Sequence, residues 1–444
     1  MNRRNTTIGI GLLGAGVVGS QVARVILAPD ADHRLSLHGI LVRDVERQRD
    51  GVPSELLTTD PESVLGDDRN DIIIEVMGGE EPARSYMATA LSAGKHVVTA
   101  NKEALAKHGD ELTNLAAQNG VSLSFEASVG GGIPVLAAIQ DSLTANRIES
   151  IRAIINGTTN YVLSSMNESG MSFEDALSEA QKLGYAEADP TADVDAHDAV
   201  YKLSILARLA FGASAHPDMI HREGIRNIGA KDLRYASALG FTIKLLAIAR
   251  VGSEGVRCRV HPALVPVDVP MANVNGVLNA VELNGDLIGP LWLQGRGAGA
   301  GPTASAVMGD VLRIAKGISA KPSPLSINGE LNGVQSTDAQ RSERIDAPNV
   351  VDMNDLQARY YIRLTCLDRF GVLAKIASVF GDATISIASV LQFDADDEHG
   401  LADLVIMTHP SHEASMQEAA SRLRQLDVVA SLENLIRVED YDTV

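Results

Sequence analysis

Short apolar runs alternate with helical patterns through the first third of the chain. The runs of strand length are Thr7–Leu13, Leu35–Val42, Ile72–Val76, His96–Ala100 and Val121–Phe125. Between them, apolar residues recur three and four positions apart, as on one face of a helix. Strands that alternate with helices predict an α/β domain built on a parallel sheet, which we expect over residues 1–143.

The pattern changes after this domain. Strand-like Ile148–Ile155 and Val256–Val265 are interleaved with long helical patterns, one of which runs from about Ala192 to Phe211. This mixture predicts a second domain of the α+β class over residues 144–320.

Weak periodicity marks the next segment, residues 321–357, which contains three prolines and the polar stretch Gln335–Asp346. These features are typical of a linker. From Arg359 to Val438 the order is strand, helix, two strands, helix and strand. It predicts a small βαββαβ domain over residues 358–444.

The charge balance narrows the class of ligand. The 57 acidic and 38 basic residues give a formal net charge of −19, which repels nucleic acids and anionic membranes. No apolar stretch approaches the roughly 20 residues of a membrane helix. Two cysteines are too few for a disulfide framework, so we expect a cytoplasmic protein with neither nucleic acid nor membrane as partner.

A glycine motif follows the first predicted strand and opens a helix. Gly14, Gly16 and Gly19 have the G-x-G-x-x-G spacing, in which the first glycine permits a tight turn, the second lets a pyrophosphate approach, and the third lets helix and strand pack closely. This context predicts a Rossmann-type NAD(P) domain. A glycine-rich turn without a ligand is the alternative, as is a signal peptide formed by Arg3, Arg4 and the apolar run behind them.

The end of the second predicted strand bears on the choice of cofactor. A carboxylate there serves the ribose hydroxyls of NAD, whereas a cation serves the 2′-phosphate of NADP. The chain has Arg43 followed by Asp44, with Arg47 and Arg49 nearby. We therefore favour NADP over NAD, although the arginines also fit a solvated face.

Carboxylates and lysines are the remaining candidates for proton transfer. No Tyr-x-x-x-Lys pair occurs, and two cysteines cannot supply a catalytic zinc set. Cys258 lies inside a strand-like run, where we expect a buried structural thiol. Asp198 and Lys202 are four positions apart and share a helix face. On spacing alone, a surface ion pair is the simpler interpretation.

Ala180–Lys202 resembles the signature of the homoserine dehydrogenases. Five further segments resemble the same family: Glu75–Ala83, Gly94–Lys102, Glu126–Pro134, Asn156–Tyr161 and Gly295–Val307. The resemblance implies reduction of L-aspartate 4-semialdehyde to L-homoserine with NAD(P)H, on the route to threonine and methionine. It also implies a homodimer or homotetramer assembled through the second domain.

Roles for individual residues follow from that resemblance. Lys202 corresponds to the proton donor, with Asp198 and Lys102 beside the reacting oxygen. The group that receives the substrate's amino end corresponds to Glu187, near Gly184 and Asp193. The expected cofactor-binding residues are Gly14, Gly16, Val17, Val18, Gly19, Arg43, Lys102 and Gly301. The chain departs from the family at Ala196, where glycine is usual, and alanine resists left-handed backbone angles.

A cation site is also implied by the resemblance. Glu126, Val129, Gly131 and Ile133 correspond to the family's sodium site, in which a carboxylate and backbone carbonyls supply hard oxygen ligands. A simple helix-entry turn is the alternative interpretation of the glycine run.

The segment from Tyr361 to Gln392 resembles an ACT domain, a module that binds amino acids at the loop between its first strand and first helix. Phe370 stands where proline is common, so the identity of the effector, threonine among the candidates, stays open. The alternative is a tail that only strengthens oligomers. Because the catalytic motifs all precede Ala358, a chain ending there is expected to fold.

Two other functions remain as alternatives. One is an NAD(P) oxidoreductase that acts on another small aldehyde or alcohol. The second is a catalytically silent amino-acid sensor, against which the presence of both Lys102 and Lys202 argues.

Overall fold

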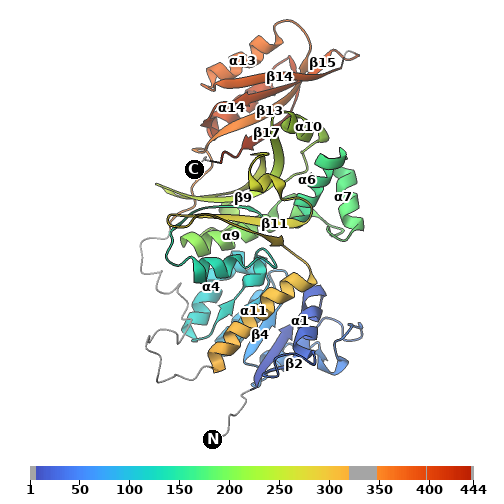
Figure 1. Ribbon diagram of the computed structural model, residues 1–444, viewed down its shortest axis with the longest axis vertical. Helices are drawn as coiled ribbons and strands as arrows, with labels where there is room; N and C mark the ends of the chain where they lie inside the picture. Colours follow the sequence, from blue (N-terminus) through green and yellow to red (C-terminus); the bar gives the residue numbers. More distant parts are fainter. Residues whose placement is uncertain (1–6, 320–347, 397, 442–444) are drawn as a thin grey trace. The chain divides into compact units, whose positions relative to one another are not determined.

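The computed structural model describes residues 7–319, 348–396 and 398–441 (Figure 1). Two compact units are formed from interleaved segments. The first comprises Met1–Glu149, Tyr201–Met219 and Val281–Asn349, and the second comprises Ser150–Val200, Ile220–Ala280 and Val350–Val444. The polar stretch Gln335–Asp346, predicted as part of a linker, lies outside the described residues.

A six-stranded parallel sheet forms the centre of the first unit, with the order β3-β2-β1-β4-β5-β6. Its strands are β1 (Ile8–Leu13), β2 (Leu35–Leu41), β3 (Leu57–Thr58), β4 (Ile72–Glu75), β5 (His96–Thr99) and β6 (Leu123–Ser124). The helices of this region are α1 (Val17–Leu27), α2 (Glu62–Leu65), α3 (Ala83–Ser92), α4 (Lys102–Gln118) and α5 (Val135–Ala137). The predicted parallel sheet is confirmed. Only the two-residue β3 was missed, because it is too short to leave a pattern.

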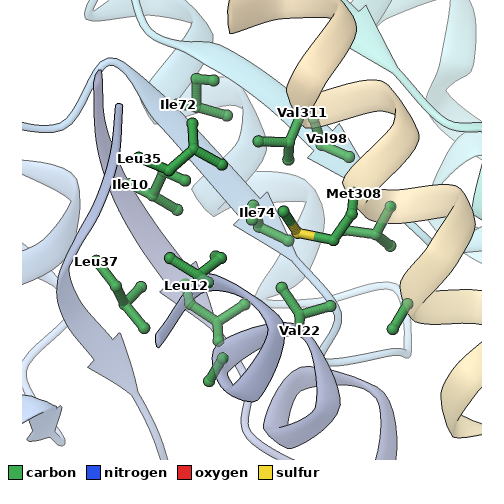
Figure 2. Close-up of a cluster of buried hydrophobic side chains, with 14 of the residues drawn as sticks. Ile10, Leu12, Val22, Leu35, Leu37, Ile72, Ile74, Val98, Met308 and Val311 are labelled. Atoms are coloured by element: carbon green, nitrogen blue, oxygen red, sulfur yellow. The ribbon is translucent and has the colours of Figure 1, made fainter. Parts of the chain in front are cut away.

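One face of this sheet is covered by a helix from far along the chain. In Figure 2, Met308 and Val311 of α11 (Ala300–Ser319) point toward strand residues such as Ile74 and Val98. All four side chains are at most 7% exposed. Strands buried on both faces need apolar residues at successive positions, and Ile8–Leu13 is buried throughout.

A mostly antiparallel sheet dominates the second unit, with the order β7-β9-β10-β17-β13-β15-β14. Its first strands are β7 (Ile148–Ile154), β9 (Phe241–Gly252) and β10 (Gly255–Pro266). The short β8 (His221–Arg222) pairs with β10. In the strand order, β11 (Leu278–Gly285) lies next to β12 (Gly289–Arg296). The accompanying helices are α6 (Gly157–Ser169), α7 (Phe173–Lys182) and α10 (Ala230–Ala238).

The single helix predicted from about Ala192 to Phe211 is wrong. The structure has a short α8 (Thr191–Val194) and a separate α9 (His197–Phe211). Ala196, between them, adopts a left-handed φ of 64°. One residue in that conformation ends one helix and redirects the chain into the next, although apolar periodicity continues across the break.

The predicted βαββαβ domain is confirmed. Its elements are β13 (Gln357–Leu367), α13 (Val372–Asp382), β14 (Ile387–Asp396), β15 (Leu401–Thr408), α14 (Glu413–Leu423) and β17 (Val429–Val438), and a short β16 (Ser411–His412) pairs with β13. The last strand β17 also pairs in parallel with β10, at Ala263 with Arg437 and Leu264 with Val438. One sheet therefore runs from β7 into this C-terminal domain (Figure 1).

Candidate active site

The glycine motif forms a tight turn between β1 and α1. Gly14 has a φ of 98°, and a Cβ atom at Gly19 would lie 2.0 Å from the Gly14 carbonyl oxygen. Neither position accommodates a side chain. A Cβ atom at Gly16, in contrast, would meet no atom within 4 Å, so the middle of the turn is open. Val17, 74% exposed, and the half-buried Val18 begin the helix behind it.

The loop after β2 carries the residues predicted to select the cofactor. Arg43 and Asp44 are both exposed, and the Asp44 carboxylate accepts a 2.9 Å hydrogen bond from the Glu46 amide. Arg49 Nε donates to the carbonyl oxygen of Ala15, 3.1 Å away, inside the glycine turn. This arginine anchors the loop to the turn.

A buried carboxylate organises the carboxyl edge of the parallel sheet. Glu75, at the end of β4, accepts hydrogen bonds from Thr99 Oγ1 at 2.5 Å and the Met77 amide at 2.8 Å. Its burial raises the pKa of its carboxyl group above the ordinary value. Asn101 Nδ2 lies 3.5 Å from Glu75, and Asn101 Oδ1 caps α4 by accepting from the Ala104 amide. The sequence alone predicts no role for Glu75.

Lys102 is the first residue of α4, directly after this cap. The later part of α9, which carries the buried Lys202, packs against the same helix. Arg208 Nη1 donates to the Leu105 carbonyl oxygen at 2.9 Å, and the Lys107 ammonium lies 5.7 Å from the Tyr201 ring centre. The two predicted catalytic lysines therefore lie on neighbouring helices.

In the second unit, the side-chain amide of Asn156 contacts two of the carboxylates predicted for the site. Asn156 Nδ2 donates to Asp193 at 2.7 Å and to Asp198 at 2.9 Å. Asn156 Oδ1 accepts from the Thr159 amide at 2.8 Å and so caps α6. Asn156 and Asp198 are each 5% exposed. Asn156 lies in one of the family segments but receives no role from the sequence, because no local pattern shows that it reaches residues 37 and 42 positions away.

Glu187 and Gly184 lie in the loop between α7 and α8. Gly184 has a left-handed φ of 75°, and the Glu187 side chain is exposed. Thr158 Oγ1 donates to the Tyr185 carbonyl oxygen at 2.7 Å and ties this loop to α6. The Glu187 carboxylate makes no hydrogen bond to the residues that the structure describes, and it is therefore not part of the Asn156 cluster.

Ala196 occupies a position that favours glycine. It is fully buried with a φ of 64°, and its carbonyl oxygen accepts from the Val200 amide in the first turn of α9. A left-handed conformation costs an alanine about 1 to 2 kcal/mol. Alanine therefore holds a left-handed turn six residues before Lys202, at a position where glycine would cost less.

Glu126 and the glycine run behind it form a second buried acidic region. The two Glu126 carboxylate oxygens accept from the amides of Leu136 and Ala137 at 3.0 and 2.7 Å. Burial, with Asp310 adding repulsion, raises the pKa of Glu126 to about 7. The Arg313 guanidinium, 3.2 Å from Asp310, offsets part of the cost of burying these carboxylates, and a cation would offset more.

The other residues of the predicted cation site lie next to this carboxylate along the chain. Val129 and Ile133 are buried, and Gly131 has a left-handed φ of 55°. A Cβ atom at Gly131 would lie 2.4 Å from the Gly297 carbonyl oxygen. Within the described ranges, no group of three or more His, Cys, Asp or Glu side chains is placed to hold a metal ion.

Two further predictions concern single residues. Gly301 is exposed at the start of α11, and a Cβ atom there would meet open space. Cys258 lies on β10, is 1% exposed, and has its thiol pKa raised to about 12 by burial. The expectation of a structural thiol is confirmed.

Three families match consecutive parts of the chain. "Homoserine dehydrogenase, NAD binding domain" matches residues 14–126, "Homoserine dehydrogenase" matches residues 134–312, and "ACT domain" matches residues 360–428. Among the described residues, no helix combines the length and apolar character needed to cross a membrane.

Relatives match almost the whole chain. A homoserine dehydrogenase of Synechocystis is 42% identical over 97% of this chain and 99% of its own length. The homoserine dehydrogenase of Corynebacterium glutamicum is 40% identical over 98% of this chain and 96% of its own length.

Solved structures agree with these relatives. The crystal structure of a homoserine dehydrogenase from Thiobacillus denitrificans matches with a TM-score of 0.88 and 39% identity, over 98% of each chain. A hyperthermophilic archaeal homoserine dehydrogenase in complex with NADPH matches with a TM-score of 0.60 and 29% identity, over 70% of this chain and 98% of its own. The chain thus belongs to the homoserine dehydrogenase family, as an oxidoreductase with a nicotinamide-cofactor domain, a catalytic domain and an ACT domain.

Proposed function

We propose that the chain catalyses the reversible NAD(P)H-dependent reduction of L-aspartate 4-semialdehyde to L-homoserine, in threonine and methionine biosynthesis. One observation supports the assignment most directly. The Asn156 amide holds Asp193 and Asp198 together at the start of the helix that carries Lys202 one turn later. Carboxylates fixed one turn before a buried lysine suit proton transfer to a substrate oxygen.

The nicotinamide, when bound, supplies the hydride to the aldehyde carbon. Negative charge then develops on the aldehyde oxygen, and the Lys202 ammonium stabilises and protonates it. Lys102, on the neighbouring helix, adds positive charge. Asp198, fixed by Asn156, orients Lys202, and the exposed Glu187 receives the substrate ammonium. Gly184 and Asp193 shape the same substrate site.

The cofactor lies on the open glycine turn in this proposal. Gly14, Gly16 and Gly19 let the pyrophosphate reach the start of α1, where unpaired backbone amides favour an anion. Arg43 then meets the 2′-phosphate of NADP. Asp44, whose carboxylate accepts one hydrogen bond from the Glu46 amide, is the group that would serve the ribose of NAD. The contributions of Val17, Val18, Lys102 and Gly301 remain part of the same proposal.

A monovalent cation, sodium in our proposal, is held by the Glu126 carboxylate and carbonyl oxygens of Val129, Gly131 and Ile133. A cation there would offset the cost of charging the Glu126 and Asp310 carboxyl groups, whose pKa values burial raises. It would stiffen the turn between the cofactor domain and α5.

Assembly and control complete the proposal. We infer a cytoplasmic homodimer or homotetramer with domain limits near residues 143, 320 and 357. The ACT domain carries feedback by an amino acid such as threonine.

Replacement of the proton donor tests the proposed reaction. Lys202→Met removes the ammonium and keeps much of the side-chain length. A general acid contributes about 10²- to 10⁴-fold, so turnover with saturating homoserine and NADP should fall by that factor. The matched control is Lys182→Met, an exposed lysine at the end of α7, which should keep normal turnover. Near-normal turnover of Lys202→Met would remove Lys202 as donor and make Lys102 the next candidate.

A further inference from the structure

A polar cavity of about 480 Å³ lies wholly within the second unit. Three segments enclose it: the β9–β10 hairpin, residues 351–358, and the end of β17. The first belongs to the catalytic domain and the last to the ACT domain. The cavity therefore lies at the place where the two parts of the continuous sheet join, and its volume suits a small metabolite.

The deepest charges of this cavity are fixed by hydrogen bonds. Arg259 on β10 and Arg437 on β17 are 7% and 2% exposed. Arg259 Nη2 donates to Glu439 at 2.9 Å, and Arg437 Nε donates to Glu413 at 2.8 Å. These bonds hold the two guanidinium groups in fixed positions.

A third guanidinium, that of Arg257, also lines the cavity. Burial lowers the pKa of Arg259, and the charges of Arg437 and Arg257 lower it further against the opposing effect of Glu439. The half-buried Arg257 makes one long hydrogen bond among the described residues, from its Nε to the Asp352 carbonyl oxygen at 3.4 Å. Its guanidinium therefore retains donors for a ligand.

Carboxylates line the same cavity. Glu254 and Asp355 are exposed at its rim, and neither forms an ion pair with another described residue. Asp440, in contrast, is engaged by Arg359. Apolar side chains of Val251, Leu356 and Val438 complete the lining. The cavity thus presents a cation, an anion and an apolar wall within the span of one small molecule.

We propose that this cavity binds a free α-amino acid, whose carboxylate contacts Arg257 and whose ammonium contacts Asp355. The inference rests on the proposed function, because it locates the effector site of a feedback-controlled enzyme. The site is distinct from the loop between β13 and α13, where Arg369 and Phe370 are exposed. A ligand in the cavity touches both the catalytic hairpin and the last ACT strand, so it stabilises their junction directly.

Calorimetric titration of the full chain with individual amino acids tests the site. The comparison compounds are the matching amino-acid amide, the matching amine without a carboxylate, and inorganic phosphate. We expect binding of one or more amino acids, and loss of binding for both analogues. Arg257→Gln and Asp355→Asn should each weaken that binding by at least about 10-fold, the effect of losing a charge-assisted hydrogen bond.

Two control variants, each replacing an exposed arginine outside the cavity, test where the amino acid binds. Arg424→Gln, at the exposed end of α14, should leave amino-acid affinity unchanged. Arg369→Gln should also leave it unchanged, and loss of binding in that variant alone would move the site to the ACT loop and overturn the proposal. Binding of phosphate without any amino acid would equally overturn it. Because titration needs no turnover, these outcomes are independent of the homoserine assay, which alone decides the proposed reaction.

Discussion

Asn156→Ala removes three functions of one buried side chain. The cap of α6 is lost, at a cost of about 1 kcal/mol. The half-buried Asp193 and the buried Asp198 each lose a donor 2.7 to 2.9 Å away, at about 1 to 2 kcal/mol for each carboxylate. The sum is roughly 3 to 5 kcal/mol, and turnover should fall by about 10²-fold because the carboxylates are no longer held in place.

Differential scanning calorimetry measures the stability loss. At about 2 to 4 °C per kcal/mol for a unit of this size, the midpoint of the transition should fall by roughly 6 to 20 °C. Ser172→Ala is the matched control, since Ser172 caps α7 through the Asp175 amide on the exposed surface. It loses only a cap and should shift the midpoint by about 2 to 4 °C.

Asn156→Asp separates the cap from the two donors. Aspartate still accepts from the Thr159 amide, but it places a third carboxylate against Asp193 and Asp198. Stability should therefore be lowest at high pH and should recover as the pH falls and repulsion is relieved by protonation. Equal shifts for Asn156→Ala and Ser172→Ala, with normal turnover in both, would refute the role of Asn156 as the organiser of the site.

Two further predictions concern the cofactor and pH. Arg43→Ala should weaken NADP binding by about 10- to 150-fold with little effect on NAD, measured by fluorescence titration, and equal effects on both would exclude contact with the 2′-phosphate. Lys244 is 2% exposed, and burial lowers its pKa from 10.5 to about 8. The unfolded chain therefore binds more protons between these values, and stability relative to Lys244→Met should rise by about 3 kcal/mol as the pH increases through that window. A pH series of urea unfolding curves checks this, and a flat difference contradicts it.

Local patterns account for what could be predicted from the sequence. The parallel sheet follows from apolar runs at successive strands, and the glycine turn follows from steric limits at Gly14 and Gly19. The ACT elements follow in the same way from alternation and helical periodicity. In each case the determining residues lie within one turn or one strand of the feature that they produce.

Contacts between distant residues account for what was missed. Glu75 accepts a hydrogen bond from Thr99, and Asn156 donates one to Asp198. Neither contact follows the periodicity of a helix or a strand, so no sequence pattern predicts it. The break before α9 was missed because Ala196 has a high helix propensity and gives no local signal of its left-handed angle. Tertiary packing decides that conformation against the local preference.

The junction between the catalytic and ACT parts argues against the expectation that a chain ending near Ala358 folds. A chain ending near Ala358 would lose β17, and the edge of β10 would be left without its partner. It would also lose Glu439, which accepts from Arg152 Nε at 2.8 Å and from Arg259 Nη2 at 2.9 Å. We therefore expect the truncated chain to aggregate rather than behave as an independent dehydrogenase.

Glu439→Gln tests the same junction without removing a domain. The side chains of Arg152 and Arg259 are each 9% exposed, so neutralising Glu439 takes a shared anionic acceptor away from two buried cations, at about 3 to 5 kcal/mol. Asp440→Asn is the matched control, because its pair with Arg359 is partly exposed and contributes at most about 1 kcal/mol. Urea unfolding of both variants should show the large loss only for Glu439→Gln. Equal losses would mean that strand pairing and apolar contacts, rather than the buried charges, join the ACT domain to the catalytic sheet.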